Sequence, residues 1–471
     1  DPLPLASVTA GETVYDLSEV TRPYLLHAAM RHFFANGGGA CYVVSTGSYD
    51  DPMSPEAMLK ALEALEKCSE ATLVVIPETA RLRHGESAAI QDAMLAHCAQ
   101  MGDRFAILDI PGGHLPEVSP LGDPVATFRT AIGIENLSYG AAYYPWLETH
   151  IHDPRNFSFR NFSNGGRNAL IDLLTASLRV GGAEADAQVF TQIKRIAPGV
   201  VEAEVRDAPD DWMADIVRHY DEAVAEGVVT ADDAARLVAD AKDAQIAMLV
   251  AKETEEIDRT LRATVPAYKD VMVAIGKRQN LIPPAAAMAG LYTMVDNTRG
   301  VWKAPANVSV SGVVEPAVAV GHEQQENLNV STTGKSINAI RPFVGEGTLV
   351  WGARTLDGNS LDWRYINVRR TILMIEESIR LATKAYVFEP NTANTWITIK
   401  SMIENFLTSV WKQGGLAGAM PEDAFSVHAG LGETMTPVDI LEGIMRVTVL
   451  VAVVRPAEFI EITFQQQMQK S

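Results

Sequence analysis

One short stretch of the sequence resembles the end of a nucleotide-binding loop. Thr333-Gly334-Lys335-Ser336 has the residue types with which such a loop holds phosphate groups: backbone amides, a lysine and a hydroxyl. The full pattern also requires a glycine five residues before Gly334, but Asn329 stands there and no clear apolar strand precedes it. We therefore interpret the stretch as an ordinary polar loop and expect no cofactor.

A second group has the side chains of a metal site. His150, His152 and Asp153 offer imidazole and carboxylate groups, which are common zinc ligands. A His-x-His pair needs a strand that places both rings on one face, together with a third ligand from elsewhere. We favour a polar loop at this position and expect no metal.

Four residues with catalytic side chains follow predicted parallel strands. Ser45, Glu78, Asp109 and His114 lie in loops of the kind at which open α/β sheets bind ligands. The sequence has neither the G-x-S-x-G elbow of hydrolases nor a glycine-rich nucleotide fingerprint. An α/β hydrolase is thus an alternative supported by fold analogy alone, and we expect no enzymatic activity.

The elements around these residues indicate an α/β fold. In the first 145 residues, short apolar strands alternate with helices, which predicts βαβ units and a mostly parallel sheet. The expected helices cover 24–35, 54–68, 85–101 and 123–133, and the expected strands cover 41–44, 72–76, 104–110 and 139–143.

Composition changes after residue 154. Residues 165–265 contain 20 acidic and 11 basic residues and little strand pattern, and amphipathic helices are predicted over 210–226 and 230–262, the second capped by Thr230. We interpret this stretch as a helical insertion with an acidic surface.

The remainder is predicted to be irregular over 283–336 and then α+β. Strands are expected at 348–351 and 386–388, and helices at 368–384 and 392–413. Two apolar strands follow at 445–454 and 458–464; such strands at a chain end invite aggregation unless another strand pairs with them. They either pair within their own subunit or add to the sheets of neighbouring copies. The residues that define them are Val447, Val449, Val451 and Val453, and Ile460, Ile462 and Phe464.

Charge excludes several classes of protein. The 471 residues carry 39 Lys+Arg against 59 Asp+Glu, a net charge of −20, whereas nucleic-acid binders need a basic surface. Anionic membranes would also repel the chain, and no apolar run approaches the ~20 residues that span a bilayer. We expect neither nucleic acid contact nor membrane insertion. The first residues show no secretory signal, and three widely spaced cysteines are typical of a reducing compartment.

Many blocks, in order along the chain, resemble the contractile tail sheath family of bacteriophages, R-type bacteriocins and extracellular contractile injection systems. Examples are Val350-Trp351-Gly352-Ala353-Arg354-Thr355-Leu356 and Val454-Arg455-Pro456-Ala457-Glu458-Phe459. Further blocks lie at 31–38, 41–44, 143–146, 299–307, 363–370, 375–379, 387–391 and 411–418. The motif positions are Trp302, Lys303, Pro305, Trp351, Arg354, Trp363, Arg369, Arg370, Glu376, Glu377, Pro390, Trp411 and Pro456.

The resemblance implies a non-enzymatic subunit that stacks in hexameric rings around an inner tube and contracts. It implies an outer α/β domain (1–150 plus 281–334), an acidic helical insertion (151–280), and an inner domain (335–471) whose arm, 445–471, joins neighbouring subunits. The family's N-terminal arm is not evident before Asp1, and the insertion is longer than in a minimal member. The expected partners are further copies, the tube, and the baseplate and cap proteins. Assembly is expected in the bacterial cytoplasm, with possible release of the particle; a sheath-like cap or baseplate adaptor is the alternative.

Overall fold

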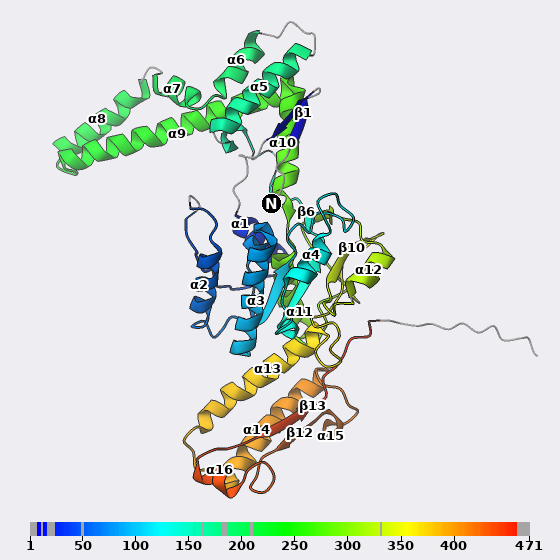
Figure 1. Cartoon of the computed structure of the whole chain (residues 1–471). Helices are drawn as coiled ribbons and strands as arrows, with labels where there is room; N and C mark the ends of the chain where they lie inside the picture. Colours follow the sequence, from blue (N-terminus) through cyan, green and yellow to red (C-terminus); the bar gives the residue numbers. More distant parts are fainter. Residues whose placement is uncertain are drawn as a thin grey trace, which may run out of the picture. The chain divides into compact units, whose positions relative to one another are not determined.

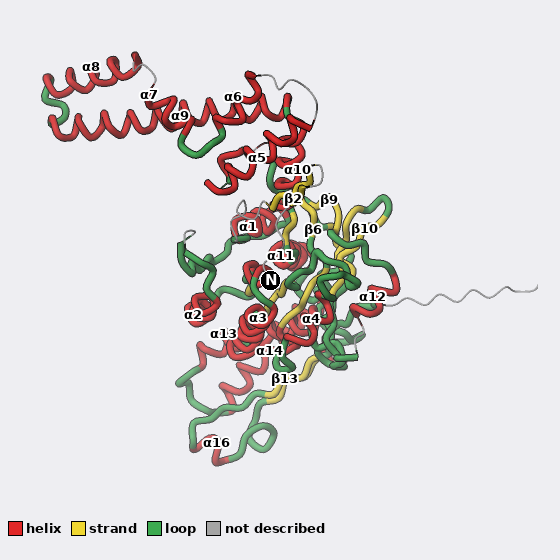
Figure 2. Tube along the Cα trace, turned by 45° about the horizontal axis from the view of Figure 1, so that its top comes forward, coloured by secondary structure: helices red, strands yellow, loops and turns green. Residues whose placement is uncertain are grey.

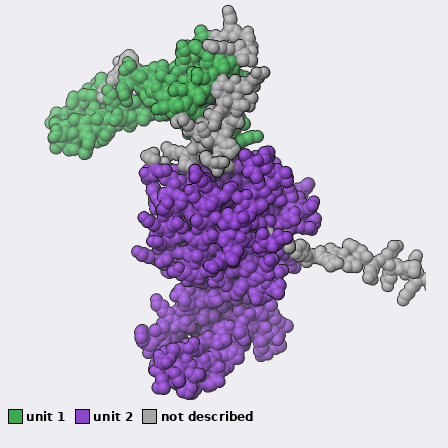
Figure 3. Space-filling view, viewed as in Figure 1, with its two compact units in different colours: residues 1–22, 152–280 green, residues 23–151, 281–471 purple. Residues whose placement is uncertain are grey.

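The computed structural model describes residues 7–10, 13–16, 24–48, 51–153, 155, 157–162, 164–180, 187–207, 211–329 and 332–458. The chain divides into two compact units (Figure 3). One comprises residues 1–22 and 152–280, and the other comprises residues 23–151 and 281–471. The helical stretch and the α/β part of the chain thus have separate interiors.

A six-stranded sheet forms the centre of the larger unit (Figure 1). Its order is β3 (Leu73–Val74), β4 (Phe105–Asp109), β5 (Gly140–Tyr144), β10 (Asn338–Phe343), β11 (Gly347–Trp351) and β8 (Val308–Ser309). The first four strands pair in parallel and the last two are antiparallel, so the predicted mixture of helices and strands is confirmed and the sheet is mixed. This sheet crosses the domain boundary predicted at 334/335.

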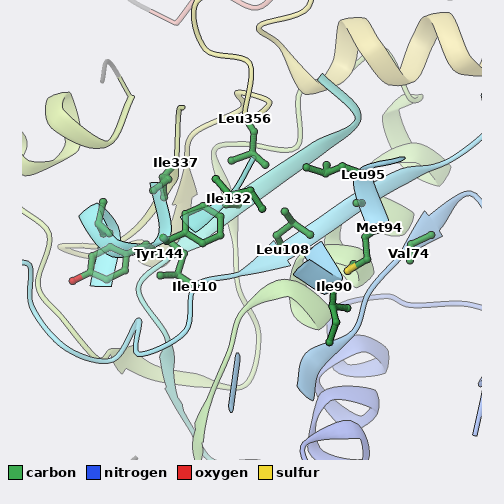
Figure 4. Close-up of a cluster of buried hydrophobic side chains, with 14 of the residues drawn as sticks. Val74, Ile90, Met94, Leu95, Leu108, Ile110, Ile132, Tyr144, Ile337 and Leu356 are labelled. Carbon is green, nitrogen blue, oxygen red and sulfur yellow. The ribbon is translucent and has the colours of Figure 1, made fainter. Parts of the chain in front are cut away.

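Helices cover both faces of this sheet because the side chains of its strands alternate. Ala106 and Leu108 of β4 pack in a cluster with helices α2 and α3, whereas Phe105 and Ile107 pack with α11 on the other face (Figure 4 shows the first cluster). The helices of this part are α1 (Leu26–Ala35), α2 (Pro55–Leu65), α3 (His84–Met101), α4 (Pro124–Ala131), α11 (Ala285–Arg299) and α12 (His322–Asn329).

The prediction of an irregular segment over 283–336 is wrong, because this part of the chain contains α11. This helix is buried at every position from Ala285 to Tyr292. A helix buried on all sides has no apolar stripe, so the helical period is absent from its sequence. It packs against α1 at Gly290, where a Cβ would lie 2.3 Å from the Phe33 carbonyl oxygen.

Two predicted short strands are also wrong. Residues 41–44 belong to no sheet, and Tyr42 and Val43 are each 57% exposed. At 386–388, a 3-10 turn (Lys384–Tyr386) is followed by Phe388 in the left-handed region, with φ 72°. In both places the β propensity of a short apolar run is overridden because no neighbouring strand supplies hydrogen bonds.

The last part of the chain forms a small α+β layer. Its helices are α13 (Ile366–Thr383), α14 (Ala393–Lys412), α15 (Pro421–Ala424) and α16 (Pro437–Leu441). Strand β12 (Phe425–His428) pairs antiparallel with β13 (Thr448–Val451). Ile399, Ile403, Leu407 and Val410 of α14 form the buried face that the sequence pattern predicts. A three-stranded sheet, β7 (Leu281–Ile282), β6 (Leu147–Thr149) and β9 (Val313–Pro316), completes this unit.

The smaller unit is helical (Figure 2). Helix α9 begins where predicted, since the Thr230 side chain accepts the Asp233 amide at 3.1 Å. Hairpin β1 (Ser7–Ala10) and β2 (Thr13–Asp16) lies beside α5 and α10, although residues 1–22 were predicted to belong to the α/β domain. The other elements are α5 (Asn164–Val180), α6 (Ala187–Arg195), α7 (Val200–Asp207), α8 (Asp211–Ala225), α9 (Ala231–Thr264) and α10 (Pro266–Gln279). Over the described residues, no helix is both long and apolar enough to cross a bilayer.

Candidate functional site

In the loop that resembles a phosphate site, the polar side chains of Lys335 and Ser336 make hydrogen bonds to the backbone. The Lys335 ammonium donates to the carbonyl oxygens of Arg129, at 2.7 Å, and of Ile132, both at the C-terminal end of α4. A cation at this end of a helix satisfies unpaired carbonyls and the negative end of the helix dipole. Ser336 donates its hydroxyl to the Asn329 carbonyl, so lysine and hydroxyl are both engaged by backbone.

Two of the three residues considered above as metal ligands, His152 and Asp153, make other hydrogen bonds. Asp153 accepts hydrogen bonds from the Arg155 guanidinium, at 2.6 Å, and from the Arg155 amide. These bonds lower the pKa of the Asp153 carboxyl to about 2. The backbone amide of His152 donates to Asn280 at 2.8 Å. In the part of the chain that the structure describes, no three His, Cys, Asp or Glu residues are arranged to hold a metal ion.

The two acidic residues that follow parallel strands accept hydrogen bonds from the N-terminal amides of helices elsewhere in the chain. Glu78 accepts the amides of Leu25 and Leu26, at 3.2 and 2.9 Å, where α1 starts. Asp109 accepts the amide of Ala285, the first residue of α11, at 2.8 Å. Burial raises the pKa of the Asp109 carboxyl to about 8, against the lowering effect of that bond.

The other two residues at these strand ends have different neighbours. Ser45 donates to the Gly47 carbonyl, and the His114 ring lies 5.1 Å from the Trp146 ring. The geometry of the acidic pair therefore favours helix capping over hydrolysis.

Two of the motif residues, Arg354 and Pro456, lie together near the last described residues of the chain. The Arg354 guanidinium forms a two-pronged ion pair with the Glu458 carboxylate, at 2.9 and 2.7 Å. The Arg354 side chain is 5% exposed and that of Glu458 is 17% exposed. Tyr365 donates its hydroxyl to the same carboxylate at 3.2 Å. A bidentate pair of this kind fixes direction as well as distance.

A second bond holds the same segment four residues earlier. The Asn367 amide group of α13 donates to the Val454 carbonyl and to the Trp302 carbonyl, both at 2.9 Å. Pro456 lies between the two fixed points, and its ring restricts the backbone there. We call the Arg354–Glu458 pair and the Asn367–Val454 bond together the arm anchor.

Two neighbouring arginines fix α13 to the α/β part. Arg369 is stacked between the rings of Tyr139 and Trp363, at 3.7 and 4.5 Å. Arg370 binds Asp296 of α11 through two nitrogens and lies over Tyr292. Helix α13 is thereby held on the sheet immediately beside the arm anchor.

The remaining motif residues are not brought to the anchor as one group. The Trp351 and Phe343 rings are tilted against each other with their centroids 4.5 Å apart, Trp411 donates to the Gly418 carbonyl, and Glu377 pairs with Arg380. The Pro390 carbonyl accepts the Thr395 hydroxyl. Lys303 is part-buried, Pro305 is buried and Glu376 is exposed. These residues shape turns, helix ends and local packing rather than a common site.

The first predicted exchange strand pairs within its own chain. β13 binds β12 from Phe425↔Val451 to His428↔Thr448, and Val453 bridges to Leu416. Val447, Val449 and Val451 are partly buried against α14, whereas Leu450 is 58% exposed. Within the described range this sheet has only two strands. Ile460, Ile462 and Phe464 lie outside the described residues.

Sequence reasoning missed the roles of Glu458 and Asn367, which had appeared only as members of quoted blocks. The hydrogen-bond partners of Asn367 and Glu458 lie far away in the sequence, so residue spacing gives no sign of them. The strand β12 was also missed, because its four residues, Phe-Ser-Val-His, give too short a pattern.

Comparison with known proteins decides the relationship. A family model described as the phage tail sheath C-terminal domain matches residues 359–467, which include Glu458 and β13. The chain is similar to contractile tail sheath proteins.

Curated sheath relatives match part of the chain. The tail sheath protein of Vibrio phage KVP40 is 29% identical over 152 residues, 32% of this chain and 22% of that protein. The tail sheath protein of Enterobacteria phage T4 is 27% identical over 138 residues, 29% of this chain and 20% of its own length. The chain thus matches only about a fifth of the length of these curated relatives.

Solved structures of contractile particles match nearly the whole chain. The sheath complex of an extracellular contractile injection system (PVC), in the contracted state, has 29% identity and a TM-score of 0.56, over 94% of this chain and 81% of that one. The helical sheath of the anti-feeding prophage (AFP), also contracted, has 26% identity and a TM-score of 0.55, over 95% and 84%. A chain of the six-fold symmetrised AFP baseplate has 26% identity and a TM-score of 0.57, over 94% and 81%.

Proposed function

We propose that this chain is a structural subunit of a contractile sheath, in a phage tail or an injection system. The observation that carries the proposal is the likeness to contracted sheath subunits over 94–95% of the chain. The use of Glu78 and Asp109 as helix caps further favours a structural role over hydrolysis.

The subunits stack as hexameric rings in a helix around an inner tube. A heterologous contact that does not close on itself generates such an array. The two-stranded sheet β12–β13 supports strand addition as the joint, since a sheet of two strands has open edges. Residues 459–471, which follow the arm anchor, supply the added strand to a neighbouring copy.

Contraction needs no nucleotide in this proposal. The extended array is held above a more stable contracted one, and the free energy difference is stored in subunit packing. The α/β part forms the outer domain, the acidic helical unit an insertion, and the C-terminal layer the tube-facing domain. Assembly takes place in the bacterial cytoplasm, with the tube, the baseplate and the cap as partners.

Deleting residues 459–471 tests the joint. The deletion leaves Glu458, the arm anchor and the β12–β13 ladder in place, so the subunit keeps its fold but loses the added strand. We expect no full-length sheaths in electron micrographs when the truncated chain is expressed with tube and baseplate, and a monodisperse folded subunit in solution. Sheaths of normal length from this chain would refute the arm joint.

A baseplate adaptor or cap of the same machine is the second candidate. The similarity to a chain of the AFP baseplate structure supports this second function. Copy number separates the two: a sheath subunit is present in hundreds of copies, in fixed ratio to the tube, whereas an adaptor is limited to a few rings. Quantitative mass spectrometry of purified particles measures that ratio.

A further inference from the structure

The arm anchor lies between two parts of the chain that a contracting array would pull apart. Residues 459–471 continue directly from Glu458, and β13 ends at Val451, just before Val454. Any tension on the arm from a neighbouring copy therefore reaches Glu458 first, then residues 455–457, the Asn367–Val454 bond and the Val453–Leu416 bridge, and only then β13.

The Arg354 guanidinium is itself fixed to the central sheet. It donates to the Asn329 carbonyl at the end of α12, at 3.0 Å. Its backbone amide donates to Asn338, the first residue of β10, and its carbonyl accepts the Asn338 side-chain amide, both at 2.8 Å. The Arg354 side chain is 5% exposed, so water competes little with these bonds. Glu458 is thus coupled to the six-stranded sheet.

The ladder behind the anchor is weak in comparison. β12 and β13 share a register of four residue pairs at the edge of a small sheet. Tension applied at one end of an antiparallel pair, across its hydrogen bonds, breaks them one after another. Without the anchor, a pull on the arm would first break the short Val453–Leu416 bridge and the bond from the Ala452 amide to the Ala424 carbonyl, and would then peel β13 from β12 starting at Val451.

We infer that the Arg354–Glu458 pair, with the Asn367–Val454 bond, diverts tension on the C-terminal arm into the central sheet and shields the β12–β13 ladder from peeling. Arg354 and Glu458 are positioning residues, because they hold the arm that contacts the next copy. This inference rests on the proposed sheath function, and it explains how the joint between neighbouring subunits stays intact during contraction.

Variants on each side of the pair test the inference. Glu458→Gln keeps the shape of the side chain and leaves the bond from Arg354 to Asn329 in place, while Arg354→Met removes the guanidinium. Arg455→Ala is the matched control: it removes a neighbouring ion pair with Asp362, at 3.6 Å, whose side chains are 55% and 79% exposed. Exposed pairs of this kind contribute little, so the control should behave as wild type.

Hydrogen exchange on the free full-length chain comes first. We expect the backbone amide at position 354, which donates to Asn338 at 2.8 Å, to exchange roughly tenfold faster in both anchor variants, as for the loss of a charged hydrogen bond. Exchange in β12 and β13 should be unchanged there, because nothing pulls on the arm. A purely local stabilising role would instead alter β13 in the free chain.

Assembled particles give the decisive readout. In contracted sheaths of the anchor variants we expect β13 amides to exchange roughly tenfold faster than in wild type, and micrographs to show broken or partly detached sheaths. Contracted variant sheaths that are intact, with wild-type protection of β13, would overturn the inference and leave the sheath function standing. Wild-type chains that never form sheaths would instead refute the proposed function. If Arg354→Met does not fold, Glu458→Gln decides alone.

Discussion

At the scale of single residues, this chain uses charged side chains to fix backbone ends inside the fold. Lys335 holds the carbonyl end of α4, while Glu78 and Asp109 hold the amide ends of α1 and α11. Arg104 is fully buried and donates to the carbonyls of Leu65, the last residue of α2, and of Cys68, just after it. The types of Lys335, Glu78 and Asp109 suggest phosphate binding or catalysis, but all three act on the unpaired backbone groups of helix ends.

The contribution of Asp109 to the free energy of unfolding can be tested through its pH dependence. Its pKa is about 8 in the folded chain against an ordinary value of 3.8, so between these pH values the folded state binds a proton that the unfolded state lacks. Stability contributed by that proton is present at low pH and falls as pH rises toward 8, by at most about 1.4 kcal/mol per pH unit. Asp109→Asn, which keeps the acceptor for Ala285, should flatten the pH dependence of the unfolding free energy between pH 5 and 8. Parallel profiles in urea titrations of both chains would contradict this.

At the scale of elements, the ends of the helical unit meet. The His152 amide donates to the Asn280 side chain, and the Asn280 side-chain amide donates back to the His152 carbonyl, both at 2.8 Å. The clusters that form the interior of the larger unit contain no residue from 152–280. The insertion is therefore a separate folding unit attached at adjacent points.

Excision follows from that geometry. Replacing residues 153–279 by a short glycine linker, and removing residues 1–22 with them, should leave a folded α/β and C-terminal part with a single cooperative thermal transition. We also expect contractile particles to form, because the helical unit has an interior of its own and assembly should not depend on it. Circular dichroism and electron microscopy check the two statements separately; a folded chain that never assembles would show that the insertion takes part in the lattice.

At the scale of the whole molecule, charge opposes packing of many copies. Each chain carries a net charge of −20, and residues 165–265 contain 20 acidic against 11 basic residues. Repulsion between exposed charges is screened over about 10 Å at 0.1 M salt and about 30 Å at 0.01 M. The arm anchor is little affected, because Arg354 is buried.

Salt should therefore favour the assembled state. Raising NaCl from 0.01 to 0.3 M should lower the subunit concentration needed for sheath formation on purified tube, a few-fold or more, by weakening the repulsion. Sedimentation at a series of concentrations measures the threshold. A threshold that rises with salt would mean that attractive ion pairs between copies dominate the lattice.

The sequence by itself determined the elements whose patterns are local. The cap at Thr230, the apolar stripe of α14 and the strand β4 follow from residue type and spacing, and the likeness to sheath proteins follows from ordered motif blocks. Only the tertiary structure decided features that depend on a distant partner. Helix α11 has no stripe because it is buried all round, and residues 41–44 form no strand for want of a neighbour. Glu458 gains its role from Arg354, 104 residues away. Propensity and period act over a few residues, whereas hydrogen bonds and burial are satisfied across the whole fold.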